Sequence, residues 1–276
     1  MRLLNRVGLN YAQQKRFTAE ASTFFTATGI TDPTQKNAID YLVKQLKANN
    51  LYSKFSVLYP FVGGSADTHK FNLINPVDSD AAFRIAWSGS VTHNANGIKS
   101  NGTNGYGDTK YNPVAASASL TSFSMGAYKK GTETAATSRV IIGNQDIPSN
   151  NISILGWISS GTTEAGGIGS ASILEYAPPV GTPNAQSDGV ITINSSGSRV
   201  AQLWVNGTKK GTTNTGTANF SNRALYVLAN NGNGTIISYA LNTVISFLYI
   251  SSGLSDAEMA TLHTIVTAYE TMLGRN

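Results

Sequence analysis

The acidic residues are the first place to look for chemistry in this 276-residue sequence. A glycosidase needs two carboxyl groups that flank one bond, and alternating positions on one strand would supply them, but no E-x-D-x-E run is present. The nearest pair is Asp78 and Asp80 in "NPVDSDAAF", where Pro76 and small residues indicate a loop whose carboxylates cap turns and helix starts. We therefore predict no catalytic residue and no enzyme.

The other residue types that carry chemistry give no constellation either. His69, His93 and His263 lie far apart and have no metal-ligand spacing. The chain has no cysteine, no G-x-S-x-G turn, and no glycine loop with the lysine that a phosphate site needs. We expect packing or surface roles for the histidines, no required metal and no cofactor.

Three aromatic residues are candidates for stacking on a sugar ring, namely Trp157, Tyr176 and Trp204. Burial in a core is the competing interpretation, above all for Trp157 in the apolar run "ISILGWI". Trp204 lies in "RVAQLWVNGTKKGTT", which predicts two strands joined by a type I′ turn at Asn206 and Gly207. Alternation places Trp204 opposite a purely apolar face, on an outer or concave surface. That apolar face consists of Ala201, Leu203 and Val205.

Composition indicates a turn-rich β protein. Only 13% of the residues are charged and 41% are hydrophobic, and from residue 55 onward short β-branched or aromatic runs alternate with Gly, Asn, Pro and Ser. Such runs predict a sandwich or a barrel. No segment approaches the ~20 apolar residues of a membrane helix, so we expect no membrane insertion. No signal-peptide core forms near the start either.

The charge is concentrated near the N-terminus. Residues 1–54 carry eight Lys and Arg against three Asp and Glu, whereas residues 55–276 carry twelve of each. The larger part is balanced and shows no basic run interleaved with aromatics, so we expect no nucleic-acid partner.

A helix is predicted over residues 31–50. Asp32 is a candidate N-cap, Pro33 occupies the first helical position, and Gln35 follows three residues after the cap. An apolar stripe needs a partner surface, which could be another subunit or the chain's own sandwich. We predict that residues 1–54 form a helical arm for attachment or oligomerisation, and that 55–276 form the sandwich. The attachment face of the stripe is Ile39, Leu42, Val43 and Leu46.

A closing helix is predicted near the C-terminus. Ser255 and Glu258 have the spacing of a capping box, and Gly274 ends the stripe. We expect this helix to dock on the sandwich. Its apolar stripe is Met259, Leu262, Val266, Tyr269 and Leu273.

Two resemblances extend these inferences. Residues 199–270, with "VAQLWVNGTKKG", "ALYVLAN" and "NTVISFLYISSGLSDAEMATLHTIV", are similar to laminin-G-like and concanavalin A-like jelly rolls. Residues 26–113, including "DAAFRIAWSGSVTHNANG" and "NGTNGYGDTKYNP", resemble a module in structural proteins of tailed phages that infect Bacteroidota. The first implies a jelly-roll β-sandwich, and the second implies a virion appendage.

The function that follows is a non-enzymatic virion protein, a head or tail fibre or decoration component assembled in the host cytoplasm. Its expected partners are other virion proteins and, because particles are symmetric, further copies of itself. The first alternative is a lectin-like module that binds host surface polysaccharide through Trp204, Trp157 or Tyr176. The second alternative is a polysaccharide-degrading enzyme whose acids come from separate strands, with Asp78 and Asp80 as the carboxylates to test.

Overall fold

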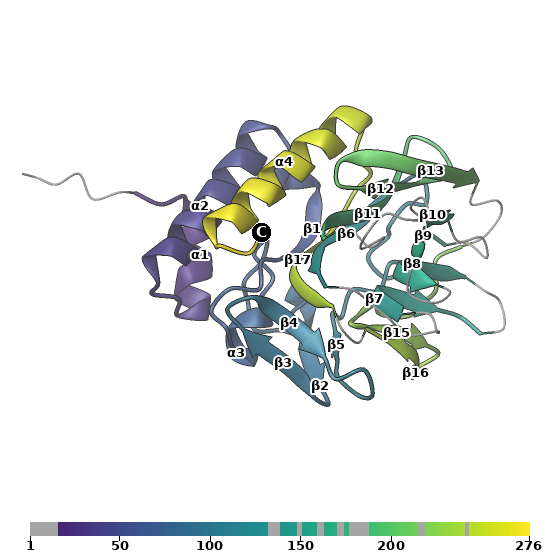
Figure 1. Ribbon diagram of the computed structural model, residues 1–276, viewed down its shortest axis with the longest axis horizontal. Coiled ribbons are helices and arrows are strands. Elements are labelled where there is room, and N and C mark those ends of the chain that lie inside the picture. Colours follow the sequence, from purple (N-terminus) through teal and green to yellow (C-terminus); the bar gives the residue numbers. More distant parts are fainter. Residues whose placement is uncertain are drawn as a thin grey trace, which may run out of the picture.

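A computed structural model of the protein describes residues 16–131, 139–147, 151–158, 163–169, 174–176, 188–214, 219–240 and 243–276. Within these ranges, the side chains at positions 157, 158, 163, 214 and 239 lie outside the description. Figure 1 shows a layer of helices on one side, a sheet in the middle and a second sheet beyond it. The helical layer consists of α1 (Ala19–Thr28), α2 (Pro33–Ala48) and α4 (Asp256–Met272).

The middle layer, sheet A, joins strands from both ends of the chain. Its order is β13-β12-β11-β6-β17-β4-β3, and β1 also pairs with β17. The described pairs within it are antiparallel. Its strands are β1 (Phe55–Tyr59), β3 (Val91–Asn94), β4 (Gly97–Ser100), β6 (Ser122–Lys130), β11 (Gly189–Ser196), β12 (Val200–Val205), β13 (Thr208–Asn214) and β17 (Val244–Ser251).

The outer layer, sheet B, has the order β10-β9-β8-β7-β14-β5-β2, with the β15-β16 hairpin added beside β7. Its described pairs are antiparallel except β15 with β7. Its strands are β2 (Ala86–Ser88), β5 (Tyr106–Asp108), β7 (Arg139–Gln145), β8 (Ile152–Ile158), β9 (Thr163–Gly167), β10 (Leu174–Tyr176), β14 (Tyr226–Val227), β15 (Ala229–Gly232) and β16 (Thr235–Tyr239). The short elements are η1 (Tyr52–Lys54), α3 (Ala66–His69) and η2 (Asp80–Ala82). The predicted mainly β, jelly-roll type of sandwich is confirmed.

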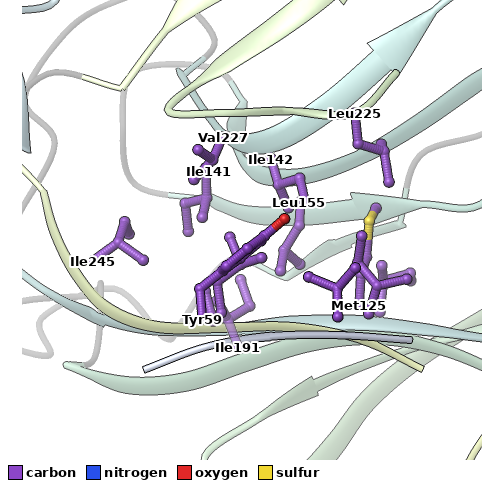
Figure 2. Packing of buried hydrophobic residues seen from close by; sticks show 14 of the residues in the cluster. Tyr59, Met125, Ile141, Ile142, Leu155, Ile191, Leu225, Val227 and Ile245 are labelled. Carbon is purple, nitrogen blue, oxygen red and sulfur yellow. The ribbon is translucent and has the colours of Figure 1, made fainter. Parts of the chain in front are cut away.

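One apolar cluster fills the space between the sheets. Figure 2 shows side chains such as Met125 and Ile191 of sheet A meeting Ile142 and Leu155 of sheet B. The predicted inward set on β12, Ala201, Leu203 and Val205, belongs to this cluster and is buried. Strand alternation therefore predicts the interior correctly.

A second apolar cluster lies between the helices and the outer face of sheet A. Phe247 and Tyr249 of β17 enter it from the sheet, and α1, α2 and α4 enter it from the other side. The predicted attachment face, Ile39, Leu42, Val43 and Leu46, is 0% exposed at all four positions. The stripe therefore packs on the chain's own helices and sheet, which is one of the two partner surfaces that the sequence leaves open, and a role in attachment stays a prediction. The boundary at residue 54 stays a prediction, although both sides of it share this cluster.

The predicted local signals are present. Asp32 accepts a hydrogen bond from the Gln35 backbone N–H at 2.8 Å, and Pro33 begins α2. Ser255 and Glu258 form the capping box of α4. The turn between β12 and β13 has positive φ at Asn206 and Gly207, 48° and 72°, as a type I′ turn requires. No described helix is long and apolar enough to cross a membrane.

Candidate functional site

The structure gives Trp204 a packing role. Its side chain points away from the inward face of β12, as alternation predicts, but α4 covers that outer face and Trp204 is only 6% exposed. Met259 and His263 of α4 line a small gap of about 10 Å³ beside it. Its indole N–H donates to Gln202 Oε1 at 3.2 Å, and Lys209 Nζ lies 5.2 Å from its ring centroid. Stacking on a sugar would require α4 to move aside.

The other two predicted aromatics share a row across sheet B. The backbone of Trp157 pairs in register with Glu164, which pairs in turn with Tyr176, while the side chain of Trp157 lies outside the described residues. Tyr176 is half-buried, packs against the interior cluster and has Lys210 Nζ 4.8 Å from its ring centroid. Glu164 is fully buried and faces Lys129 at 3.1 Å. Burial raises the pKa of Glu164, and the Lys129 charge offsets this only in part.

The carboxylates of the enzyme alternative are held in ion pairs on the surface. Arg84 reaches both, with N–O distances of 3.4 Å to Asp78 and 3.1 Å to Asp80. Lys70 donates to Asp78 Oδ2 at 2.8 Å, and this hydrogen bond holds the pKa of Asp78 below its ordinary value. A general acid needs a raised pKa, so this arrangement suits structure better than proton transfer.

Two of the histidines meet although they are 24 residues apart. His69 Nε2 accepts a hydrogen bond from the Gly64 N–H at 3.2 Å, so the single proton of the neutral ring is on Nδ1. This Nδ1–H donates a hydrogen bond to His93 Nδ1 at 3.1 Å. Burial lowers the pKa of His69 to about 3, with smaller contributions from His93 and Arg275. Among the described residues, no three His, Cys, Asp or Glu side chains gather as a metal site would require. The pair is thus a neutral, buried structural contact.

A pocket of about 180 Å³ opens between one end of strands β6 and β17 in sheet A and the segment after α4. The turn after β3 supplies Asn96, the end of β6 supplies Lys130, and the segment after α4 supplies Arg275. We call it the C-terminal pocket. Its complete described lining is Asn96, Lys130, Val244, Ser246, Gly274 and Arg275.

Arg275 builds the wall of the C-terminal pocket. It is 4% exposed, and its guanidinium donates to the carbonyls of Ala95 at 2.9 Å, Phe61 at 2.8 Å and Ser246 at 3.2 Å. A longer bond of 3.4 Å reaches the Pro60 carbonyl. These acceptors come from three separate parts of the chain, so Arg275 fixes the segment after α4 against the sheet.

Glu270 is the counter-ion behind this wall. Its Oε2 lies 3.7 Å from Arg275 Nη1, and its carboxylate oxygens approach Arg275 and the Ser246 hydroxyl without reaching full hydrogen-bond geometry. Burial raises the pKa of Glu270 to about 7, although the Arg275 charge and the nearby Ser246 hydroxyl act in the opposite direction. The carboxyl therefore changes charge close to neutral pH.

Two polar side chains of the C-terminal pocket, Ser246 and Lys130, have donors that a ligand could use. Ser246 is 3% exposed, and its hydroxyl, which lies near Glu270, has no partner at full hydrogen-bond geometry among the described residues. Lys130 is exposed, and its ammonium makes one long hydrogen bond, 3.4 Å, to the Arg275 carbonyl. With the Asn96 amide, the pocket offers a hydroxyl, an amide and a cation, which can bind hydroxyl and carboxylate groups of a ligand.

The sequence reasoning missed this site because its residues are spread along the chain. Asn96, Lys130 and Arg275 belong to no motif, and they meet only through strand pairing in sheet A together with the docking of the segment after α4. Arg275 directly follows Gly274, whose only predicted role is to end the C-terminal helix. A charged residue directly after a capped helix was the one available signal, and it is a weak one.

The comparisons with known proteins agree on the fold. No protein-family model matches the chain, and the search of curated proteins found no significant match. The binding domain of botulinum neurotoxin serotype D is similar in structure, with a TM-score of 0.53 and 13% identity over 80% of this chain and 52% of that one. The binding domain of botulinum neurotoxin DC in complex with SialylT has a TM-score of 0.54 and 11% identity, over 80% and 52% of the two chains.

A third similar structure concerns cell entry of botulinum neurotoxin type C, which depends on interaction with two ganglioside molecules. It has a TM-score of 0.54 and 11% identity, over 82% of this chain and 53% of that one. The present chain thus spans about half the length of these structures. At such identities the likeness shows a shared jelly-roll architecture.

Proposed function

We propose that this protein is a carbohydrate-binding module without catalytic activity, and that the C-terminal pocket is its binding site. The observation that carries the proposal is the pocket itself, with a buried hydroxyl at Ser246 that has no partner at full hydrogen-bond geometry among the described residues, and open polar groups at Lys130 and Asn96. Sugars present many hydroxyl groups, and a buried donor or acceptor without a partner is the kind of group that a polar ligand satisfies.

Two further observations support the proposal. The similar neurotoxin structures include one in complex with SialylT and one that concerns ganglioside interaction. The candidate acids of the enzyme alternative, Asp78 and Asp80, are engaged by Arg84, and no described pair of carboxylates lines the pocket. A binding role therefore fits better than hydrolysis, and host surface polysaccharide is the ligand to test.

The test is binding of the full chain to a panel of bacterial surface polysaccharides and defined oligosaccharides. Asn96→Phe should block the pocket mouth and lower affinity about tenfold or more, because it replaces an exposed amide of the lining with a bulky ring. Thr92→Phe on the same hairpin is the control, since Thr92 is exposed and lies outside the lining. Failure of every saccharide to bind would contradict the proposal. Equal binding by Asn96→Phe would move the site elsewhere.

We also propose a setting for this module, a virion appendage of a tailed phage, on the strength of the resemblance of residues 26–113. In that setting it is assembled in the host cytoplasm with other virion proteins and repeats on a symmetric particle. Quantitative peptide mass spectrometry of purified particles tests this. High copy number relative to the major capsid protein would indicate a head decoration, a few to tens of copies a fibre, and absence a free glycan-binding protein.

A further inference from the structure

We propose that the C-terminal pocket selects an acidic sugar, whose carboxylate pairs with Lys130 Nζ while the buried Ser246 hydroxyl donates to the same sugar residue. This inference rests on the proposed carbohydrate-binding function and names the class of ligand. Its basis is the difference between the polar groups of the pocket that are already engaged and those that are not.

Lys130 is the first group that is not engaged. Ion pairs hold many described lysines, for example Lys209 with Asp256 at 2.7 Å and Lys54 with Glu258 at 2.6 Å. Within the described ranges, no carboxylate lies within ion-pair distance of Lys130, whose long hydrogen bond goes to a backbone carbonyl. A ligand carboxylate would give this ammonium the charge-assisted hydrogen bond that it lacks.

Arg275, by contrast, is engaged. Its Nε, Nη1 and Nη2 atoms already donate to backbone carbonyls, and it also faces Glu270. It therefore shapes the pocket and adds positive potential, but direct ligand contact would break bonds that hold the wall. This division makes Lys130 the ligand-contacting cation and Arg275 a positioning residue.

Ser246 is the second group with capacity left for a ligand. Its residue is 3% exposed and lines the pocket, and among the described residues its hydroxyl has no partner at full hydrogen-bond geometry, although it lies close enough to Glu270 to lower the pKa of that carboxyl. Leaving a buried hydroxyl unpaired is unfavourable, and an acceptor in the pocket would remove that penalty. The volume of about 180 Å³ lies below the ~300–1,000 Å³ of sites for drug-sized ligands, which suits a single sugar residue.

The charges around Glu270 predict how pH acts on this binding. The groups that interact with it are Tyr269 and Arg275 from its own segment, Lys130 and Tyr128 from β6, and Ser246 from β17. A bound carboxylate would disfavour the ionised form of Glu270, whose pKa burial already raises to about 7. Binding of an acid should therefore take up a proton and tighten as the pH falls from 8 to 6.

The experiment is calorimetric titration of the full chain with an oligosaccharide that ends in glucuronic acid or N-acetylneuraminic acid. Its neutral partner is the methyl ester of the same oligosaccharide. Lys130→Gln should weaken acid binding roughly tenfold or more, Ser246→Ala by a smaller factor, and Lys130→Arg should recover most of the loss. Lys99→Gln on neighbouring β4 is the matched control, because it removes the same charge outside the lining.

The possible results distinguish failure of the acidic-sugar inference from failure of the proposed carbohydrate-binding function. If the acid and its ester bind equally, or if Lys130→Gln behaves like Lys99→Gln, the acidic class is wrong while carbohydrate binding stands. If no saccharide binds, the proposed function itself fails. If acetate or inorganic phosphate competes as well as the acidic sugar does, the pocket is a plain anion site and the inference is overturned.

Discussion

The two sheets of this sandwich differ in how many of their faces are buried. Sheet A has the interior cluster on one face and the helices on the other, so Tyr249 and Phe247 on its outer face are 0% and 1% exposed. Sheet B has its inner face in the interior cluster, and apart from that cluster it buries only a small apolar group, Val140, Ile152 and Ile154. On its outer side, Ile147 beyond β7 and Ile237 on β16 are 50% and 46% exposed.

The cover on both faces of sheet A explains the sequence pattern of its strand β17. In β17, "VISFLYIS", seven of the eight residues are buried, with the first half-buried, because a strand covered on both faces has no polar side. The helices are thus structural partners of sheet A, and separating them from it would expose a complete apolar face. Four predictions test this view, from the largest expected effect to the smallest.

Deletion of residues 1–50 should have the largest effect. It removes α1 and α2, uncovers Leu58 and Tyr249, and should yield aggregated or molten protein instead of a folded sandwich. Near-ultraviolet circular dichroism and ANS binding measure this. A soluble truncated chain with a native spectrum would restore the separable arm that the sequence suggests.

Trp204→Ala should have the second-largest effect on the stability of the fold. Truncating a 6%-exposed tryptophan under α4 should lower the free energy of unfolding by about 3–5 kcal/mol, and Tyr176→Ala, at a half-buried ring, by clearly less. Urea denaturation measures both. Saccharide affinity should be unchanged in folded Trp204→Ala, so a selective loss of binding would return Trp204 to the site.

Glu270→Gln should alter the pH dependence of stability. Because the folded-state pKa is raised from 4.5 to about 7, this carboxyl stabilises the fold fully below its unfolded pKa, and the contribution is lost as pH rises through 7. The wild type minus variant difference in unfolding free energy should thus fall by about 1 kcal/mol from pH 6 to pH 8. His69, whose lowered pKa acts in the opposite direction, is present in both proteins and cancels. A flat difference would show that Glu270 does not titrate there.

Ile237→Ser should have the smallest effect. The side chain is 46% exposed on the open side of sheet B, so the unfolding free energy should change by no more than about 0.5 kcal/mol. Leu42→Ser is the comparison. Leu42 lies on the buried face of α2 at 0% exposure, so this substitution should lower the unfolding free energy several times more. Equal losses in the two variants would mean that the faces are equivalent after all.

Sequence reasoning succeeds here where the cause is local. The Asp32 cap, the Ser255 capping box and the turn at Asn206 and Gly207 depend on residues within one turn of each other, and all three are present. The stripe on α2 is recognisable as apolar, but its partner stays open between another subunit and the chain's own sandwich, because periodicity predicts that a face is buried without identifying the surface that covers it.

The candidate site shows the same limit more strongly. Arg275 binds carbonyls at positions 60, 61, 95 and 246, and the first three lie 180 residues or more away in the chain. No short stretch of the sequence contains both the guanidinium and the carbonyl groups that it binds. Trp204 shows a related limit, since it faces outward as its strand requires and is then covered by a helix that begins at residue 256.

The central place of β17 in sheet A also bears on how the protein is made. Its partners β1, β4 and β6 lie between 114 and 196 residues earlier, judged by the paired positions Ser251 with Phe55, Ile245 with Ile98, and Val244 with Lys130. During translation those strands leave the ribosome well before the strand that joins them. Sheet A therefore completes only after β17 has been synthesised, and contacts so distant along the chain predict slow folding, with bare strand edges that chaperones would recognise in the meantime.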